Sequence, residues 1–139
     1  MSPAPDSDTL ILVSPLEEDH LSLGRFLIST GFRVHRAQTR QEALAVLRNG
    51  RVAVVISERD LPEGGWKEVL RELKPLAHPP FLIVTSLQAD DRLWAEVLNL
   101  GGHDVLPKPF RAGEVTRVVS LACRRWADQQ EQEAHPITS

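Results

Sequence analysis

The fold is decided by residues 52–66, which read VAVVISERDLPEGGW. The first five residues are all apolar, which predicts a strand buried on both faces, because a strand with one solvated face would alternate apolar and polar residues. The chain then turns polar from Ser57 to Asp60, and Pro62 with the Gly64-Gly65 pair predicts a loop before the next helix. In open α/β sheets, ligands bind just beyond such strand ends. We therefore expect the functional site near Glu58.

Composition and charge limit the class of protein. The 139 residues are 42% hydrophobic and 25% charged, which is typical of one soluble globular domain. A formal net charge of −3 provides no basic surface for nucleic acid or for an anionic membrane. Apolar runs are shorter than the roughly 20 residues that cross a bilayer, residues 1–8 do not resemble a signal peptide, and the single Cys123 agrees with a reducing compartment. We expect a cytoplasmic protein with neither nucleic acid nor membrane as partner.

The chain alternates predicted strands and helices. Residues 1–8 are expected to form a disordered N-terminal tail, residues 9–126 one domain, and residues 127–139 a polar C-terminal tail. Strands followed by helices predict parallel pairing with right-handed crossovers, and hence an open α/β sheet covered on both faces. Pro107 lacks an amide donor and places the last strand at an edge. Strands are predicted at 10–13, 32–35, 52–56, 81–85 and 103–106, and helices at 16–30, 40–49, 66–73, 93–100 and 115–126.

The first predicted helix has a charged start. Glu17, Glu18 and Asp19 crowd its first turn, where carboxylates interact favourably with the helix dipole. The second helix has a capping box, with Thr39 three residues before Glu42. Apolar residues on one face of the first helix are expected to be Leu16, Leu23, Phe26 and Leu27.

Three segments together resemble the receiver domains of bacterial two-component response regulators. They are the loop SERDLP at 57–62, the strand end Val84-Thr85-Ser86, and the segment GGHDVLPKPF at 101–110. The resemblance covers residues 9–126. It implies a flavodoxin-like (βα)5 doubly wound parallel sheet with strand order 2-1-3-4-5, and a cis peptide bond between Lys108 and Pro109.

The resemblance also implies a site for aspartyl phosphorylation. In this family a carboxylate at the end of the third strand accepts the phosphoryl group, and Mg²⁺ is held by that carboxylate and by an acidic pair after the first strand. A hydroxyl and a lysine bind the phosphoryl oxygens, and by position these are Thr85 and Lys108. The acceptor position falls on Glu58, and the acidic pair falls on Ser14 and Pro15.

These departures predict a degenerate receiver, or pseudo-receiver. A Mg²⁺ site commonly rests on one or two carboxylates, whereas proline offers no side-chain ligand and serine only a neutral one. Glu58 is one methylene longer than aspartate, and a misplacement of about 1 Å can cost roughly a hundredfold in rate. We expect no metal, no cofactor and little or no phosphorylation. Glu58 is expected to form an ion pair with Lys108 or with its neighbour Arg59, and the switch position, normally aromatic, falls on Val105.

Several alternatives remain open. Glu17, Glu18 and Asp19 could replace the missing acidic pair if the first loop were long, although the gapless count from Val13 to Gly31 favours a role as helix-start charges. The chain would then be a functional phospho-acceptor receiver with an unusual acceptor site in a phosphorelay. Alternatively, Glu58 could mimic a phosphorylated aspartate, although one carboxylate carries less than the charge of about −1.5 to −2 of a phosphoryl group.

An unrelated function on the same fold is disfavoured. A flavodoxin-like cofactor-binding protein needs donors for a phosphate after the first strand, and residues 14–18 contain no glycine and two carboxylates instead. A DNA-binding role lacks a basic helix-turn-helix segment.

The resemblance to receivers implies a signalling domain, not an enzyme, that binds a protein partner such as a histidine kinase or a downstream effector. In receivers the face made by the fourth helix, fifth strand and fifth helix is the usual partner or dimer surface. Trp94 lies on the fourth helix and marks this face as a candidate surface for a partner or a homodimer, with ordinary packing as the alternative. Trp66 and Trp126 lie on apolar helix faces and are expected in the core or in semi-exposed packing. His103 is a candidate for titration near neutral pH.

Overall fold

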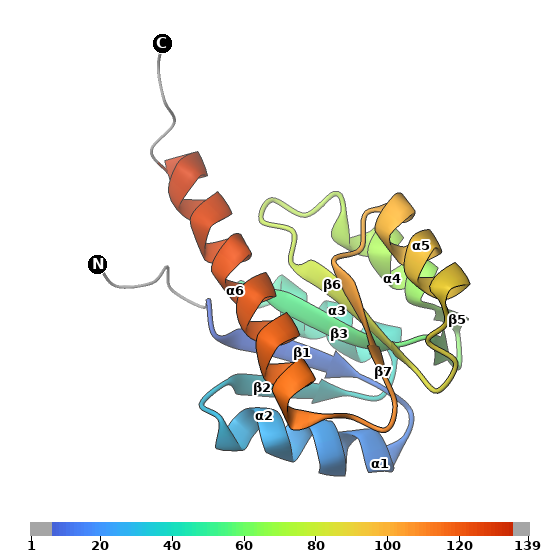
Figure 1. Cartoon of the computed structure of the whole chain (residues 1–139). Helices are drawn as coiled ribbons and strands as arrows, with labels where there is room; N and C mark the ends of the chain where they lie inside the picture. The colour runs from blue at the N-terminus through green and yellow to red at the C-terminus, as the bar shows by residue number, and fades with distance from the viewer. Residues whose placement is uncertain (1–6, 135–139) are drawn as a thin grey trace.

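The structure is a computed structural model that describes residues 7–134 (Figure 1). The predicted disordered tail at 1–8 lies outside the described residues except for Ser7 and Asp8, which form a turn before the first strand. The backbone carbonyl of Asp8 already accepts a hydrogen bond from the amide of Arg33, at 2.9 Å.

Five parallel strands form the central sheet, in the order β2-β1-β3-β6-β7. This order confirms the predicted flavodoxin-like 2-1-3-4-5 arrangement, and β3 lies at the centre because its apolar run is covered on both faces. The last strand contains Pro107 and pairs only with β6, as a strand at the sheet edge does. The strands are β1 (Thr9–Val13), β2 (Arg33–Ala37), β3 (Val54–Glu58), β6 (Phe81–Ser86) and β7 (Asp104–Pro107).

Helices cover both faces of this sheet (Figure 1). One core lies between the sheet and α3, α4 and α5, and includes Ala43, Val69 and Leu93 from these three helices. The other lies under the first helical segment and α6, and includes Leu27 and Trp126. The helices are α1 (Glu17–Asp19), η1 (His20–Gly24), α2 (Arg25–Ser29), α3 (Arg40–Arg48), α4 (Trp66–Leu73), α5 (Asp91–Leu100) and α6 (Ala112–Ala134).

The first helical segment differs from the regular helix that the spacing predicts. α1, η1 and α2 follow one another without a break, and η1 is a π-helical turn, which is wider than an α-helical turn. Leu23 and Leu27 are buried as predicted, and Phe26 is half-buried. The assignment of Leu16 to this apolar face is wrong, because Leu16 precedes the first helical residue and is 46% exposed.

Two further segments differ from the prediction. The loop expected after β3 contains a short hairpin, β4 (Asp60–Leu61) paired antiparallel with β5 (Gly64–Gly65). α6 continues past Trp126 to Ala134, into the segment predicted to be a polar tail, and Gln130 in this extension is buried. Residues 127–134 contain no glycine or proline and are rich in good helix formers, so the helix has no reason to end at Trp126. The remainder of that tail, 135–139, lies outside the described residues.

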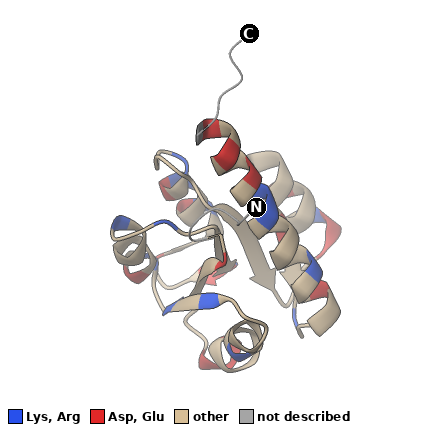
Figure 2. Ribbon diagram, turned by 90° about the vertical axis from the view of Figure 1, so that its left-hand side faces the viewer, with Lys and Arg blue, Asp and Glu red and all other residues tan. Residues whose placement is uncertain are grey.

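The strand register places the ends of the strands together. Glu58 lies directly opposite Thr85, and Ser86 lies opposite Pro107. Lys108 follows Pro107, and its peptide bond to Pro109 is cis as expected. In the view of Figure 2, basic and acidic residues are interspersed along the helices, and α6 carries both signs. Within residues 7–134, no helix is both long and apolar enough to cross a membrane.

Candidate functional site

After β1, a hydrogen-bond network holds the carboxylate of Asp19 in a buried position. Ser14 follows the last residue of β1 and is fully buried. Its hydroxyl Oγ donates to Asp19 Oδ2 at 2.7 Å and accepts from the amide of Leu16 at 3.1 Å. The carbonyl of Ser14 accepts from Nε2 of His20 at 2.9 Å, which fixes the other side of the loop. Asp19 is thereby 3% exposed, although it belongs to the charged first turn of a helix.

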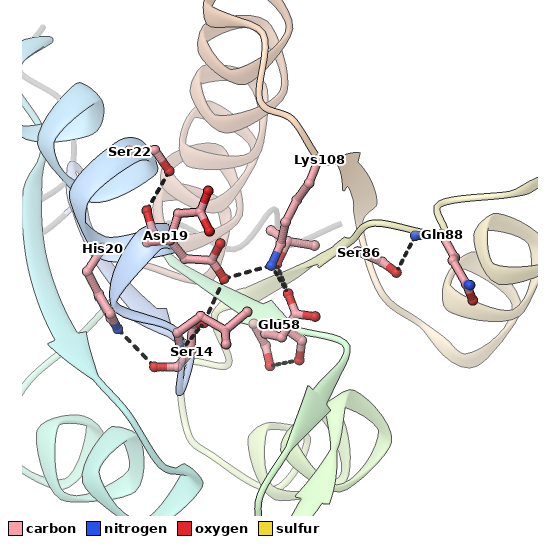
Figure 3. Close-up of polar contacts among 12 residues, drawn as sticks. Ser14, Asp19, His20, Ser22, Glu58, Ser86, Gln88 and Lys108 are labelled. Atoms are coloured by element: carbon pink, nitrogen blue, oxygen red, sulfur yellow. Dashed lines mark hydrogen bonds and ion pairs between the residues drawn. The ribbon is translucent and has the colours of Figure 1, made fainter.

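Lys108 connects this network to the end of β3 (Figure 3). Its ammonium nitrogen Nζ lies 2.8 Å from Asp19 Oδ2 and 2.5 Å from Glu58 Oε2. Thr85 Oγ1 donates to the same Glu58 oxygen at 3.0 Å. The expected ion pair between Glu58 and Lys108 is therefore present, and Asp19 is a second partner of the same lysine. All three charged side chains are largely buried, with exposed fractions of 9% for Lys108, 4% for Asp19 and 12% for Glu58.

The two carboxylates keep Lys108 charged. Burial alone would lower the pKa of Lys108, but the hydrogen bonds and negative charges of Asp19 and Glu58 outweigh burial and raise that pKa above its ordinary value. The site thus holds one ammonium and two carboxylates, a net charge of −1 when all three are ionised. The ammonium of Lys108 thus donates a charge-assisted hydrogen bond to each of the two carboxylates.

The residues of this site do not fit Mg²⁺ well. Pro15 supplies no side-chain ligand, and it is exposed. Ser14 supplies only a hydroxyl, and that hydroxyl is used as a donor to Asp19. Both carboxylates already contact the ammonium of Lys108. In the described part of the chain, no three His, Cys, Asp or Glu side chains are grouped so that they could hold a metal ion.

Asp19 is the site residue that the sequence interpretation placed elsewhere. Its interpretation as a helix-start charge is correct for Glu17 and Glu18, which are exposed, and incomplete for Asp19. The regular spacing assumed for the first helix ignores η1, the π-helical turn directly after Asp19. Such turns occur frequently at functional sites. A usable signal was the serine at the end of β1, which needs a hydrogen-bond partner once it is buried.

The other predicted positions lie outside this charge network. Val105, the predicted switch position, is buried in β7. Trp94 lies on α5 and is 48% exposed. Trp66 and Trp126 are buried in the two cores, as predicted.

His103 lies at the opposite end of the sheet, just before β7. Its ring stacks on Phe81 with centroids 5.4 Å apart, and its Nε2 accepts from Arg125 Nη1 at 3.3 Å. Burial, followed by the positive charge of Arg125, lowers the pKa of His103 below its ordinary value, against a smaller opposing effect of Asp104. The neutral form therefore predominates at neutral pH, and the titration of His103 lies on the acidic side of its usual range.

Acidification should destabilise the fold through His103. Because folding lowers the pKa of this histidine, its contribution to stability is fully present above the unfolded-state value of 6.5 and is lost as the pH falls through the lower folded-state pKa. The free energy of unfolding is measured with urea at pH 7.5 and at pH 5.5. Its decrease between these two pH values should be smaller for His103→Gln than for the unmodified protein. His35→Gln, on the exposed part of β2, is the control and should keep the full drop. Equal drops in all three proteins would contradict this assignment.

Comparison with known proteins identifies what this architecture is similar to. A family model described as the response regulator receiver domain matches residues 18–120. The chain is 31% identical over 112 residues to the KDP operon transcriptional regulatory protein KdpE of Escherichia coli. This alignment covers 78% of this chain and 49% of that protein. The chain spans about half the length of the curated transcriptional regulators it matches.

Solved structures show the same fold. The signal receiver domain of an HD domain-containing protein from Pseudomonas fluorescens Pf-5 superposes with a TM-score of 0.83 at 22% identity, covering 95% of this chain and 98% of that one. The beryllofluoride-activated NtrC4 receiver domain dimer superposes with a TM-score of 0.78 at 18% identity, covering 86% of this chain and 98% of that one.

Proposed function

We propose that this chain, which belongs to the response regulator receiver domain family, is a signalling domain that acts through protein partners and does not depend on phosphorylation. Two-component signalling is the setting that the family provides. Within it, the domain is proposed to be a non-enzymatic pseudo-receiver that binds no Mg²⁺ and presents a binding surface to a histidine kinase or a downstream effector.

One observation carries this proposal: the carboxylate at the acceptor position is a glutamate that is already engaged. Its Oε2 contacts both Lys108 and Thr85, the two groups that in the family bind the phosphoryl oxygens. An in-line transfer requires the attacking oxygen to be placed accurately against the donor phosphorus. The longer side chain of Glu58 and its contacts to Lys108 and Thr85 oppose that placement.

The protein should remain unmodified when it is incubated with acetyl phosphate and Mg²⁺. The measurement is the intact mass, which should show no added phosphoryl group under conditions that label a receiver with aspartate at the acceptor position. In parallel, amide chemical shifts of Glu58, Thr85 and Lys108 should stay constant on adding beryllofluoride. A stoichiometric adduct mapped to Glu58 would overturn the proposed independence from phosphorylation.

A functional phospho-acceptor receiver is the second candidate, and the position of Asp19 favours it. This carboxylate meets Glu58 through their common partner Lys108, so the site has a second acidic group despite Ser14 and Pro15. The mass measurement separates the two candidates. If an adduct forms, Asp19→Asn should abolish it, because the remaining site would then have a single carboxylate.

The partner surface is proposed to lie on α5, β7 and α6, with Trp94 at its centre. Trp94 and Leu98 are one helical turn apart on α5, and both are nearly half exposed, at 48% and 45%. Leu100, near the end of the same helix, is 42% exposed. Exposed apolar side chains grouped on one helix are typical of protein interfaces. A homodimer through this face is the form of the proposal that can be tested without another protein.

A further inference from the structure

The ammonium group of Lys108 lies between two largely buried carboxylates and contacts both of them. Asp19 comes from the first helical segment and Glu58 from the end of β3, so the lysine joins two elements that are far apart in sequence (Figure 3). Each carboxylate presents one oxygen to the same nitrogen, at 2.8 Å and 2.5 Å. Hydroxyls hold both of these oxygens in place, Ser14 on Asp19 and Thr85 on Glu58.

We propose that Lys108 is the built-in cation of this site and that it excludes divalent metal ions from it. The charge of the site would then be constant whatever the concentration of divalent cations around the protein. This inference rests on the proposed phosphorylation-independent function. It adds a physical reason why the charge of the site does not change, namely that Lys108 supplies the cation.

The charges explain why the lysine is required. Without it, Asp19 and Glu58 would place two carboxylates a few ångströms apart in a largely buried site, where desolvation and like-charge repulsion both oppose ionisation. One ammonium reduces the net charge of the site from −2 to −1 and donates a charge-assisted hydrogen bond to each carboxylate.

The lysine also has an advantage over a free ion. It is covalently attached, so its effective concentration at the site is high and does not depend on the solution. A magnesium ion demands near-octahedral oxygen ligands and gives up its water reluctantly. It would have to displace the ammonium from two contacts and would find at the position of Pro15 no ligand to replace one of its waters.

A hollow of about 420 Å³ borders the site on the side of Asp19 and Lys108, and its other lining residues include the apolar side chains of Leu16, Phe26 and Phe110. Truncating Lys108 would open the space of its side chain next to this hollow. The two carboxylates and their hydroxyl partners would remain in place as oxygen ligands for a replacement cation.

The test is to remove the lysine and replace its charge from solution. Lys108→Ala and the unmodified protein are titrated separately with Mn²⁺ and with propylammonium, which matches the missing part of the side chain, and binding is followed by calorimetry and by thermal unfolding. The variant should bind Mn²⁺ at least about tenfold more tightly than the unmodified protein, because its site has lost a competing positive charge. Mn²⁺ and propylammonium should each raise its melting temperature and should compete with each other.

Two further variants sharpen the result. Lys108→Arg keeps a cation between the carboxylates and should bind no more Mn²⁺ than the unmodified protein. Adding Glu58→Gln to Lys108→Ala removes one carboxylate and should weaken Mn²⁺ binding again. If Lys108→Ala is unfolded alone, folding on addition of either cation supports the proposal, and failure of both cations to fold it overturns the proposal.

Tight Mn²⁺ binding by the unmodified protein, or no gain in the variant, would also overturn it. These outcomes are separate from those for phosphorylation. An acetyl phosphate adduct on the unmodified protein would reject the proposed function, whereas the response of Lys108→Ala to cations tests only the role of the lysine charge.

Discussion

Lys108→Met should lower the free energy of unfolding at pH 7 by about 3–5 kcal/mol, the usual cost of leaving buried charge without its partner. Methionine retains most of the volume of the side chain and removes its charge, so the loss reports electrostatics more than packing. Asp19 and Glu58 would face each other with side-chain exposures of only 4% and 12% and with no ammonium between them. Urea unfolding of the two proteins measures the difference.

The control for this prediction is Asp19→Asn. It removes one of two carboxylates and leaves Glu58 paired with Lys108 in a neutral pair, so it should cost only about 0.5–1.5 kcal/mol, the range for one hydrogen bond. Removing the single cation should therefore be much more damaging than removing one anion. A loss that is equal in the two variants would show that the site does not depend on the lysine as its common counter-ion.

The pH dependence of Lys108→Met provides an independent check. Without the ammonium, burial and mutual repulsion both oppose the ionised forms of the two carboxyl groups. The cost to the folded state therefore depends on their ionisation and disappears as the pH falls and they become protonated. The deficit of the variant should shrink between pH 7 and pH 4. A constant deficit over this range would indicate a packing defect instead.

The sequence predicted those strands whose residue pattern matches their place in the sheet. The apolar run at 52–56 is unbroken because its strand is covered on both faces, and Pro107 lies in the strand that has only one neighbour. The strand pattern indicated a site near Glu58, and the resemblance to receivers added Thr85 and Lys108, which the structure brings into contact with Glu58. Strand order accounts for this proximity, because parallel strands end at one edge of the sheet.

Asp19 and the end of α6 could not be predicted in this way. The direction of the Asp19 side chain depends on a π-helical turn and on the buried hydroxyl of Ser14, which no helical periodicity of apolar residues reveals. The extension of α6 consists of polar residues and reads as a tail. Its composition is equally suited to a solvated helix, and the burial of Gln130 in that extension depends on tertiary contacts.

Trp126→Ala should lower the free energy of unfolding by about 3–5 kcal/mol, the range for truncating a buried tryptophan. Trp126 is 0% exposed and belongs to the core between α6 and the sheet, together with Leu10, Ala53 and Ile83. Truncation removes most of a large apolar surface from this core and leaves a cavity that the rigid sheet can fill only in part. Urea or thermal unfolding monitored by circular dichroism measures the loss.

Trp94→Ala is the matched control, because it makes the same chemical change on a side chain that is 48% exposed. Its effect on stability should be within about 0.5 kcal/mol, as for most surface substitutions. If Trp94 marks the partner face, sedimentation at high concentration should show self-association that Trp94→Ala loses while its stability is kept. A large loss of stability in Trp94→Ala would assign this tryptophan to packing, whereas unchanged stability with unchanged association would move the partner surface away from α5.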